Sequence, residues 1–173
     1  KDKCKIILSV NRLEYRKRVD LALEGFYKYH SLYNDNSILI IVGIGECENE
    51  LKIKVKSYGI ERVVKFVGLI SDDDLKLFYQ VSDVCVSMIW GTWAISVIEP
   101  LLYNKPQIIS DEIPDLLSEI KNLFKSPLNS LDVAQTINDA ISSPAFNSAE
   151  IMKKKLNWKA VSKNILSICS EQG

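Results

Sequence analysis

The feature that most constrains the fold is a series of short runs of Ile and Val that are apolar at nearly every position. Such runs are typical of parallel strands covered on both faces, whereas strands with one wet face alternate apolar and polar residues. The segments with this character are 5–10, 37–42, 63–68, 83–88 and 106–110. The sequence therefore predicts a sheet that is buried on both sides.

Amphipathic segments with helical spacing separate these strands. They are 19–33, 46–58, 72–81 and 95–103. The third is preceded by Ser71 in the run SDDD, an S-x-x-D capping box that predicts a helix start there. Strand followed by helix, repeated along the chain, predicts an α/β fold with a Rossmann-like, doubly wound parallel sheet and right-handed crossovers.

After residue 111 the pattern becomes helical. The predicted helices are one near 113–119, one over 131–142 opened by Ser130, one near 148–156 and one over 159–170. A length of 173 residues suits one domain with a sizeable core. We therefore expect a single domain over residues 1–173 with a helical C-terminal segment.

Composition excludes several classes of function. Lys plus Arg equals Asp plus Glu at 22 each, which argues against a nucleic-acid partner because such proteins usually carry a basic excess. No apolar run reaches the ~18 residues of a membrane span, so we expect no span in this chain, while peripheral membrane association of the full-length protein stays open. The only histidine is His30, which argues against a His-based metal centre or catalytic triad.

The cysteines are far apart in the sequence and form no C-x-x-C pair. They are Cys4, Cys47, Cys85 and Cys169. Free core thiols in a reducing compartment fit this spacing better than disulfides or a metal site. With no signal peptide visible, the expected location is the cytoplasm.

The loops that follow the strands are the expected ligand site, because open parallel sheets bind ligands at the carboxyl ends of their strands. The loop after the first strand, NRLEYRKR, offers Arg12, Arg16, Lys17 and Arg18. Arg grips two phosphate oxygens at once and Lys supplies a mobile charge, so these cations suit a diphosphate. The alternative is a solvated charge run beside a helix.

The next loops carry weaker signals. Gly43 and Gly45 lie in VGIGE, but Glu48 stands where a dinucleotide fingerprint needs glycine, so NAD or FAD binding is not supported. The glycines either allow a ligand to approach the backbone or only form a turn. Beside Gly68, the backbone amide and carbonyl groups of Val67 and Leu69 could form hydrogen bonds with the edge of a nucleotide base. The alternative is that this segment is only the end of a buried strand.

Residues 90–100 read WGTWAISVIEP and contain one carboxylate, Glu99. On a helical projection Glu99 lies at the border of a broad apolar arc, so it needs a polar partner. Ser96 and Glu99 form an S-x-x-E capping box, in which Glu99 would accept from the Ser96 amide. The functional alternative is a ribose diol as the partner of Glu99.

The ordered set of these segments resembles a known family. SVNRLEYRKRVDLALEGF, LIIVGIGE, VKFVGLISDDDLKLFYQVSDVCVSM, SVIEPLLYNKPQIIS and LNWKAVSKNILSI follow one another as in the C-terminal, nucleotide-sugar-binding domain of family 4 retaining glycosyltransferases of the GT-B fold. The resemblance covers nearly the whole chain. It implies donor binding for transfer of a sugar from a nucleoside diphosphate to a glycan or lipid-linked acceptor.

The resemblance also implies roles for individual residues. Arg12 and Lys17 match the Arg and Lys of the family's motif G-R-L-x-x-x-K-G, which hold the donor diphosphate. Asn11 and Arg18 replace the first and last glycines of that motif. Gly43, Val67, Gly68 and Leu69 fall in the nucleotide site. Glu99 matches the family's ribose glutamate, and the amides of Ala94, Ile95 and Ser96 at a helix start would add to diphosphate binding.

One motif position departs from the family. A glutamate that contacts the transferred sugar should stand at position 91, where this chain has Gly91. Three explanations stay open: a variant sugar contact through Thr92, a non-catalytic pseudo-enzyme or partner subunit, or a residue that differs from that of the natural protein. An epimerase of the same fold is disfavoured by the ordered motifs.

The resemblance further implies a cofactor-free reaction. No carboxylate pair suited to Mg²⁺ stands in the loops, and an Arg/Lys pair can replace the metal. A GT-B enzyme also needs an N-terminal acceptor domain, which this chain does not contain. We therefore expect the isolated chain to bind nucleotide weakly and to turn over little.

Overall fold

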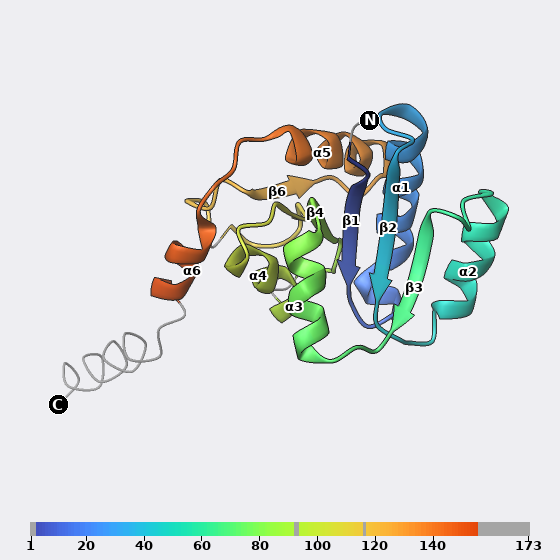
Figure 1. The fold of residues 1–173 in the computed structure, drawn as a ribbon, viewed down its shortest axis with the longest axis horizontal. Helices are drawn as coiled ribbons and strands as arrows, with labels where there is room; N and C mark the ends of the chain where they lie inside the picture. The colour runs from blue at the N-terminus through green and yellow to red at the C-terminus, as the bar shows by residue number, and fades with distance from the viewer. Residues whose placement is uncertain (1–2, 92–93, 116, 156–173) are drawn as a thin grey trace.

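Six parallel strands form one sheet in the computed structural model of the chain (Figure 1). The structure describes residues 3–91, 94–115 and 117–155. The strands are β1 Lys5–Val10, β2 Ser37–Val42, β3 Val64–Gly68, β4 Val84–Ser87, β5 Gln107–Ser110 and β6 Leu123–Ser126. The helices are η1 Tyr15–Lys17, α1 Val19–Leu32, α2 Glu48–Ser57, α3 Asp72–Val81, α4 Ile95–Leu102, α5 Ser130–Ser142 and α6 Ser148–Lys155.

The strand order is β3-β2-β1-β4-β5-β6, with every pair parallel. The chain winds outward from β1 to β3, then returns to place β4 on the other side of β1. The loops after β1 and β4 therefore diverge at a topological switch point, where doubly wound sheets open a crevice for ligands. The predicted Rossmann-like α/β fold is confirmed.

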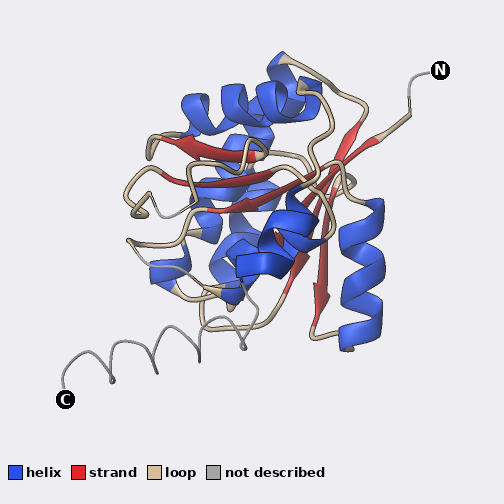
Figure 2. Ribbon diagram, turned by 90° about the vertical axis from the view of Figure 1, so that its left-hand side faces the viewer, coloured by secondary structure: helices blue, strands red, loops and turns tan. Residues whose placement is uncertain are grey.

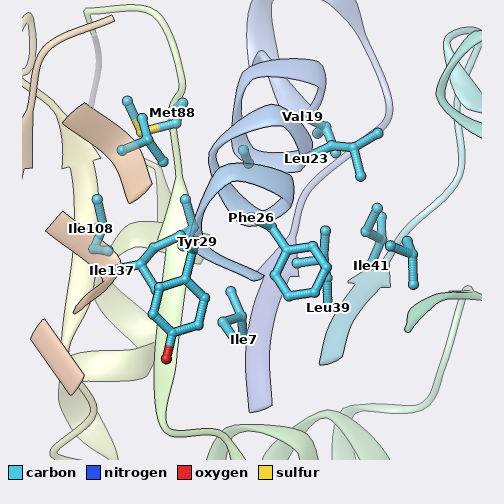
Figure 3. Packing of buried hydrophobic residues seen from close by; sticks show 14 of the residues in the cluster. Ile7, Val19, Leu23, Phe26, Tyr29, Leu39, Ile41, Met88, Ile108 and Ile137 are labelled. Carbon is cyan, nitrogen blue, oxygen red and sulfur yellow. The ribbon is translucent and has the colours of Figure 1, made fainter. Parts of the chain in front are cut away.

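Helices cover both faces of the sheet (Figure 2). Because side chains alternate along a strand, Ile7 of β1 joins the core under α1, α2 and α5, and Leu8 joins the core under α3. Figure 3 shows Phe26 and Tyr29 of α1 lying against Ile7 and the neighbouring strands. Burial on both faces is the reason why these strands read as continuous apolar runs.

Polar caps set two helix starts. The Ser71 hydroxyl accepts from the Asp74 amide at 3.1 Å, which confirms the predicted helix start with Ser71 as its cap; the Asp74 carboxylate accepts from the Ser71 hydroxyl at 2.7 Å. In α5 the cap is Asn129, whose side chain accepts from the Asp132 amide at 3.0 Å, so Ser130 is the first helical residue and not the cap. Both caps satisfy amides that have no partner inside the helix.

Part of the prediction for the C-terminal half is wrong. Residues 113–115 and 117–119 are turns and irregular backbone, and β6 was not expected from the sequence. Ile113 and Leu117 mimic helical spacing because both are buried, but they pack against different parts of the core. The helices predicted over 131–142 and 148–156 are present as α5 and α6, while 159–170 lies outside the described residues.

The described cysteines are free thiols: Cys47 and Cys85 are buried, and Cys4 is half-buried just before β1. Burial raises the pKa of the Cys85 thiol to about 12, so this group stays protonated and unreactive at neutral pH. Cys169 lies outside the described residues.

Candidate functional site

A pocket of about 700 Å³ opens at the carboxyl ends of the strands, at the switch point between β1 and β4. This volume lies in the range of small-molecule and cofactor sites. The described lining residues come from the loops after β1, β2 and β3 and from the starts of α3 and α4: Val10, Asn11, Arg12, Glu14, Lys17, Val42, Gly43, Ile44, Gly45, Glu46, Leu69, Ile70, Leu75, Ala94, Ile95 and Ser96.

Gly43 and Gly45 bring the first two loops together. A Cβ on Gly43 would lie 2.0 Å from the Asn11 carbonyl oxygen, and one on Gly45 would lie 2.4 Å from that of Leu13. Gly43 also has a φ of +125°, which L side chains rarely adopt. Gly43 is thus required by the packing of the two loops, and it also lines the pocket, while its predicted part in nucleotide binding stays a prediction.

The first loop provides the cations of the pocket. Arg12 and Lys17, the predicted diphosphate ligands, both line it. The Arg12 guanidinium lies 3.1 Å from the Glu14 carboxylate, and its side chain is 79% exposed. Lys17 is half-buried at the end of η1 and has no ion pair within the described part of the chain. Lys17 is therefore a cation available for an anionic ligand.

Arg18 has a structural role. It adopts the left-handed conformation, with a φ of 48°, between η1 and α1. Its guanidinium donates to Glu112 at 2.7 and 3.5 Å and lies 5.3 Å from the centroid of the Trp90 ring. The left-handed backbone explains why a glycine is the residue expected at this position by resemblance.

The start of α4 forms another part of the wall. Ala94, Ile95 and Ser96 line the pocket, so the first amides of α4 lie at its edge. The Asn11 Oδ1 atom accepts from the hydroxyls of Ser87 at 3.2 Å and Ser96 at 3.4 Å. This contact ties the ends of β1 and β4 to α4. Free helix N-terminal amides favour an anion here.

Glu99 does not cap α4. The helix begins at Ile95 with Ala94 as the cap residue, so Ser96 is already helical and the predicted capping box is wrong. Instead, Glu99 accepts a hydrogen bond from the Tyr79 hydroxyl at 2.9 Å. Burial and the Glu99 charge raise the pKa of Tyr79, so this group donates at all ordinary pH values.

Glu99 lies beside the pocket lining. It is half-buried one helical turn beyond Ile95, on the same face of α4, just as Tyr79 lies one turn beyond Leu75 on α3. Ile95 and Leu75 do line the pocket, whereas Glu99 is absent from the lining as described. Glu99 thus lies at the flank of the pocket, held by Tyr79.

The predicted base-binding segment is only partly in the pocket. Leu69 lines it and is 74% exposed. Val67 packs against the core under α3, and the Gly68 carbonyl accepts from the Gly43 amide at 2.8 Å, so neither belongs to the described lining. The carbonyl of Gly68 holds the second and third loops together.

Gly91 is exposed and has a φ of 48°, and no atom of the described residues beyond its chain neighbours lies within 4 Å of the position that a Cβ would take. The position therefore has space for a side chain but a backbone that favours glycine. Thr92, offered by the sequence as a variant sugar contact, lies outside the described residues.

Sequence reasoning missed several parts of the site. Ile44, Ile70 and Leu75 are pocket residues that look like ordinary apolar residues in the sequence. Glu14 was not recognised as the carboxylate that pairs with Arg12 and Arg16. An acid two residues from each of two cations was the available signal for that pairing.

No metal site was found in the described ranges, where no group of three or more His, Cys, Asp or Glu side chains could hold an ion. None of the helices described here has the length and apolar character needed to cross a bilayer.

The family model of the glycosyl transferases group 1 matches residues 1–159. The chain belongs to this family. An uncharacterized glycosyltransferase of Methanocaldococcus jannaschii is 24% identical over 95% of the chain and 44% of its own length. Alpha-monoglucosyldiacylglycerol synthase of Streptococcus pneumoniae is 27% identical over 87% of the chain and 34% of its own length.

Solved structures of GT-B glycosyltransferases share the fold of this chain. Sucrose-phosphate synthase of Thermosynechococcus elongatus superposes with a TM-score of 0.78 at 19% identity, covering 97% of this chain and 45% of that one. Anabaena HepE in complex with UDP and glucose superposes with a TM-score of 0.77 at 18% identity, covering 95% and 48%. The chain thus spans less than half the length of these relatives.

Proposed function

We propose that this chain binds the nucleoside-diphosphate sugar donor of a glycosyltransferase. The observation that carries the proposal is the pocket of about 700 Å³ at the β1/β4 switch point, which Lys17 and the first residues of α4 both line. A lysine with no ion pair among the described residues and a helix N-terminus in one pocket suit a diphosphate. Membership of the group 1 family supports the same ligand.

Arg12 and Lys17 are the proposed diphosphate groups. As the sugar leaves, negative charge grows on the diphosphate, and these cations stabilise that charge electrostatically. Arg12 is 79% exposed, so its guanidinium can leave Glu14 and turn to the ligand. Two such cations supply the charge that a divalent metal supplies elsewhere, so we propose a metal-free reaction.

The nucleoside is proposed to lie between the apolar rim and α4. Ile44, Leu69 and Ile95 are large exposed apolar residues that reach the pocket from three different segments. Glu99, one turn beyond Ile95, is the proposed acceptor for the ribose hydroxyls, with its carboxylate oriented by Tyr79. Glu99 has a second oxygen that can accept from ribose.

The acceptor side is proposed from the relatives. The chain covers 44% of the M. jannaschii relative and 34% of the S. pneumoniae synthase, whose name indicates a lipid acceptor. We propose a glycan or lipid-linked acceptor, a partner domain that completes the cleft, and transfer with retention. The cytoplasmic location and the low activity of the isolated chain stay predictions.

Calorimetric titration with UDP, GDP and ADP tests donor binding, with UDP first because the HepE structure contains it. Arg12→Ala should weaken binding of UDP but leave binding of uridine almost unchanged, because only the diphosphate meets Arg12. Arg62→Ala is the matched control, because Arg62 is an exposed arginine just before β3 at the amino end of the sheet. If none of the three diphosphates binds, the donor-site proposal is wrong.

A non-catalytic donor-binding subunit is the second candidate, and Gly91 is the observation that favours it. A Cβ at position 91 meets no atom of the described residues within 4 Å, but a glutamate there would strain the backbone by about 1 kcal/mol. Hydrolysis or transfer of the sugar by the parent protein would exclude this candidate. Gain of transfer in Gly91→Glu, with unchanged UDP affinity, would support it.

A further inference from the structure

A second hollow of about 380 Å³ adjoins the donor pocket. Its described lining consists of Arg16, Lys17, Ile89 and Trp90. Lys17 lines both this hollow and the donor pocket. A group joined to a diphosphate at Lys17 would therefore have this hollow next to it. We call these four residues the second pocket.

Trp90 offers a flat apolar surface that is held in position. Its side chain is exposed, at 64% for the residue, which is unusual for so large an apolar group. The Arg18 guanidinium stacks on the indole, and Glu112 holds that guanidinium. The Trp90 amide also donates to the Arg16 carbonyl at 3.1 Å. An exposed, preorganised indole suits the apolar face of a sugar ring.

The polar side chains of the second pocket are donors only. Arg16, Lys17 and the Trp90 indole have no acceptor atom. The nearest carboxylate to Arg16 is Glu14, at 3.7 Å, and Glu14 lies closer to Arg12, at 3.1 Å. A sugar hydroxyl both donates and accepts hydrogen bonds, and these side chains can satisfy only its acceptor capacity. A carboxylate or phosphate accepts only, and its charge is matched too.

We propose that the second pocket binds a sugar that carries a carboxylate or phosphate. Its ring lies against Trp90, and its anionic substituent is held by Arg16, with Lys17 shared with the diphosphate. This inference rests on the proposed donor function. The anionic sugar is either the sugar of the nucleotide donor or the acceptor. Titration with sugar nucleotides tests the first case, and titration of the UDP-saturated protein with free sugars tests the second.

Calorimetry on the purified protein tests the proposal with UDP, UDP-glucose and UDP-glucuronate. We expect UDP-glucuronate to bind up to about fivefold more tightly than UDP-glucose, the range of an exposed ion pair. Arg16→Gln should remove this preference for UDP-glucuronate over UDP-glucose. Trp90→Ala should weaken both sugar nucleotides by about fivefold but not UDP, and Trp90→Phe should restore most of the loss.

An acceptor sugar is tested on the UDP-saturated protein, with glucose 6-phosphate against glucose. A preference for the phosphate that is lost in Arg16→Gln assigns the anionic sugar to the acceptor. Arg62→Gln should change neither preference, because it lies at the amino end of the sheet.

The outcomes separate this inference from the donor proposal. UDP binding with no anion preference in either series overturns the second pocket alone, and so does a loss that is equal in Arg16→Gln and Arg62→Gln. Failure of UDP to bind at all overturns the donor proposal and the inference with it.

Discussion

The hydrogen bond between Tyr79 and Glu99 is the contact by which the ribose proposal can be measured. Tyr79 is 1% exposed on α3, and its hydroxyl donates to the half-buried Glu99 of α4 at 2.9 Å. Tyr79→Phe removes this donor and keeps the ring. Glu99→Gln removes the charge and keeps an acceptor oxygen. Together they form a double-mutant cycle on one contact.

The expected size follows from burial and charge. A hydrogen bond to a charged group contributes about 1.5–3 kcal/mol, and water can reach Glu99, so we expect Tyr79→Phe to destabilise by about 1.5 kcal/mol. For a chain of this size that corresponds to a melting temperature lower by about 3–6 °C. Glu99→Gln should lose about 1 kcal/mol, because a neutral acceptor forms a weaker bond.

The assay combines denaturant unfolding with ligand binding. We expect a coupling energy of about 1 kcal/mol between Tyr79→Phe and Glu99→Gln in unfolding. If Glu99 also binds the ribose, Glu99→Gln should weaken the binding of UDP by about 1–2 kcal/mol and leave the binding of 2′,3′-dideoxy-UDP unchanged. Tyr79→Phe should reduce the same discrimination between UDP and its dideoxy form, because the carboxylate loses its orientation.

Two results would refute this reasoning. Unfolding energies that add within about 0.3 kcal/mol would show that the Tyr79–Glu99 bond contributes nothing measurable. A Glu99→Gln variant with a lower melting temperature and an unchanged preference for UDP would give Glu99 a structural role only.

The remaining predictions concern backbone and pH. Gly43→Ala should destabilise by about 3 kcal/mol, because the new Cβ would lie 2.0 Å from the Asn11 carbonyl, while Gly68→Ala, with open space and a φ of +69°, should lose only about 1 kcal/mol in the same urea titration. Arg18→Gly should be about 1 kcal/mol more stable than Arg18→Ala, because φ is 48° there; equal melting temperatures would contradict the left-handed backbone. The raised pKa of Tyr79 keeps its proton in the folded state while the unfolded chain loses one near pH 10. The folded state then binds more protons, so the free energy of unfolding should fall above pH 10, by up to about 1.4 kcal/mol per pH unit more in the parent than in Tyr79→Phe.

The strands of the first two thirds of the chain were predictable from the sequence because burial on both faces leaves a local signature. The predicted segments 5–10 and 37–42 coincide with β1 and β2. The strand β6 has no such signature: it is four residues long at the edge of the sheet, and its exposed Lys125 breaks the apolar run. Only pairing with β5 makes it a strand, and pairing is a tertiary event.

The sequence by itself determined the fold class and the cationic first loop, since both depend on neighbours along the chain: apolar periodicity for the sheet, and Arg12 and Lys17 within one loop. Only the tertiary structure decided the partner of Glu99. The sequence offered the Ser96 amide or a ribose as partners of Glu99. In the structure the Tyr79 hydroxyl, twenty residues away on another helix, donates a hydrogen bond to Glu99. The tertiary structure also places the Arg18 guanidinium over the Trp90 ring. Contacts between separate elements depend on strand order and packing, which no local pattern records.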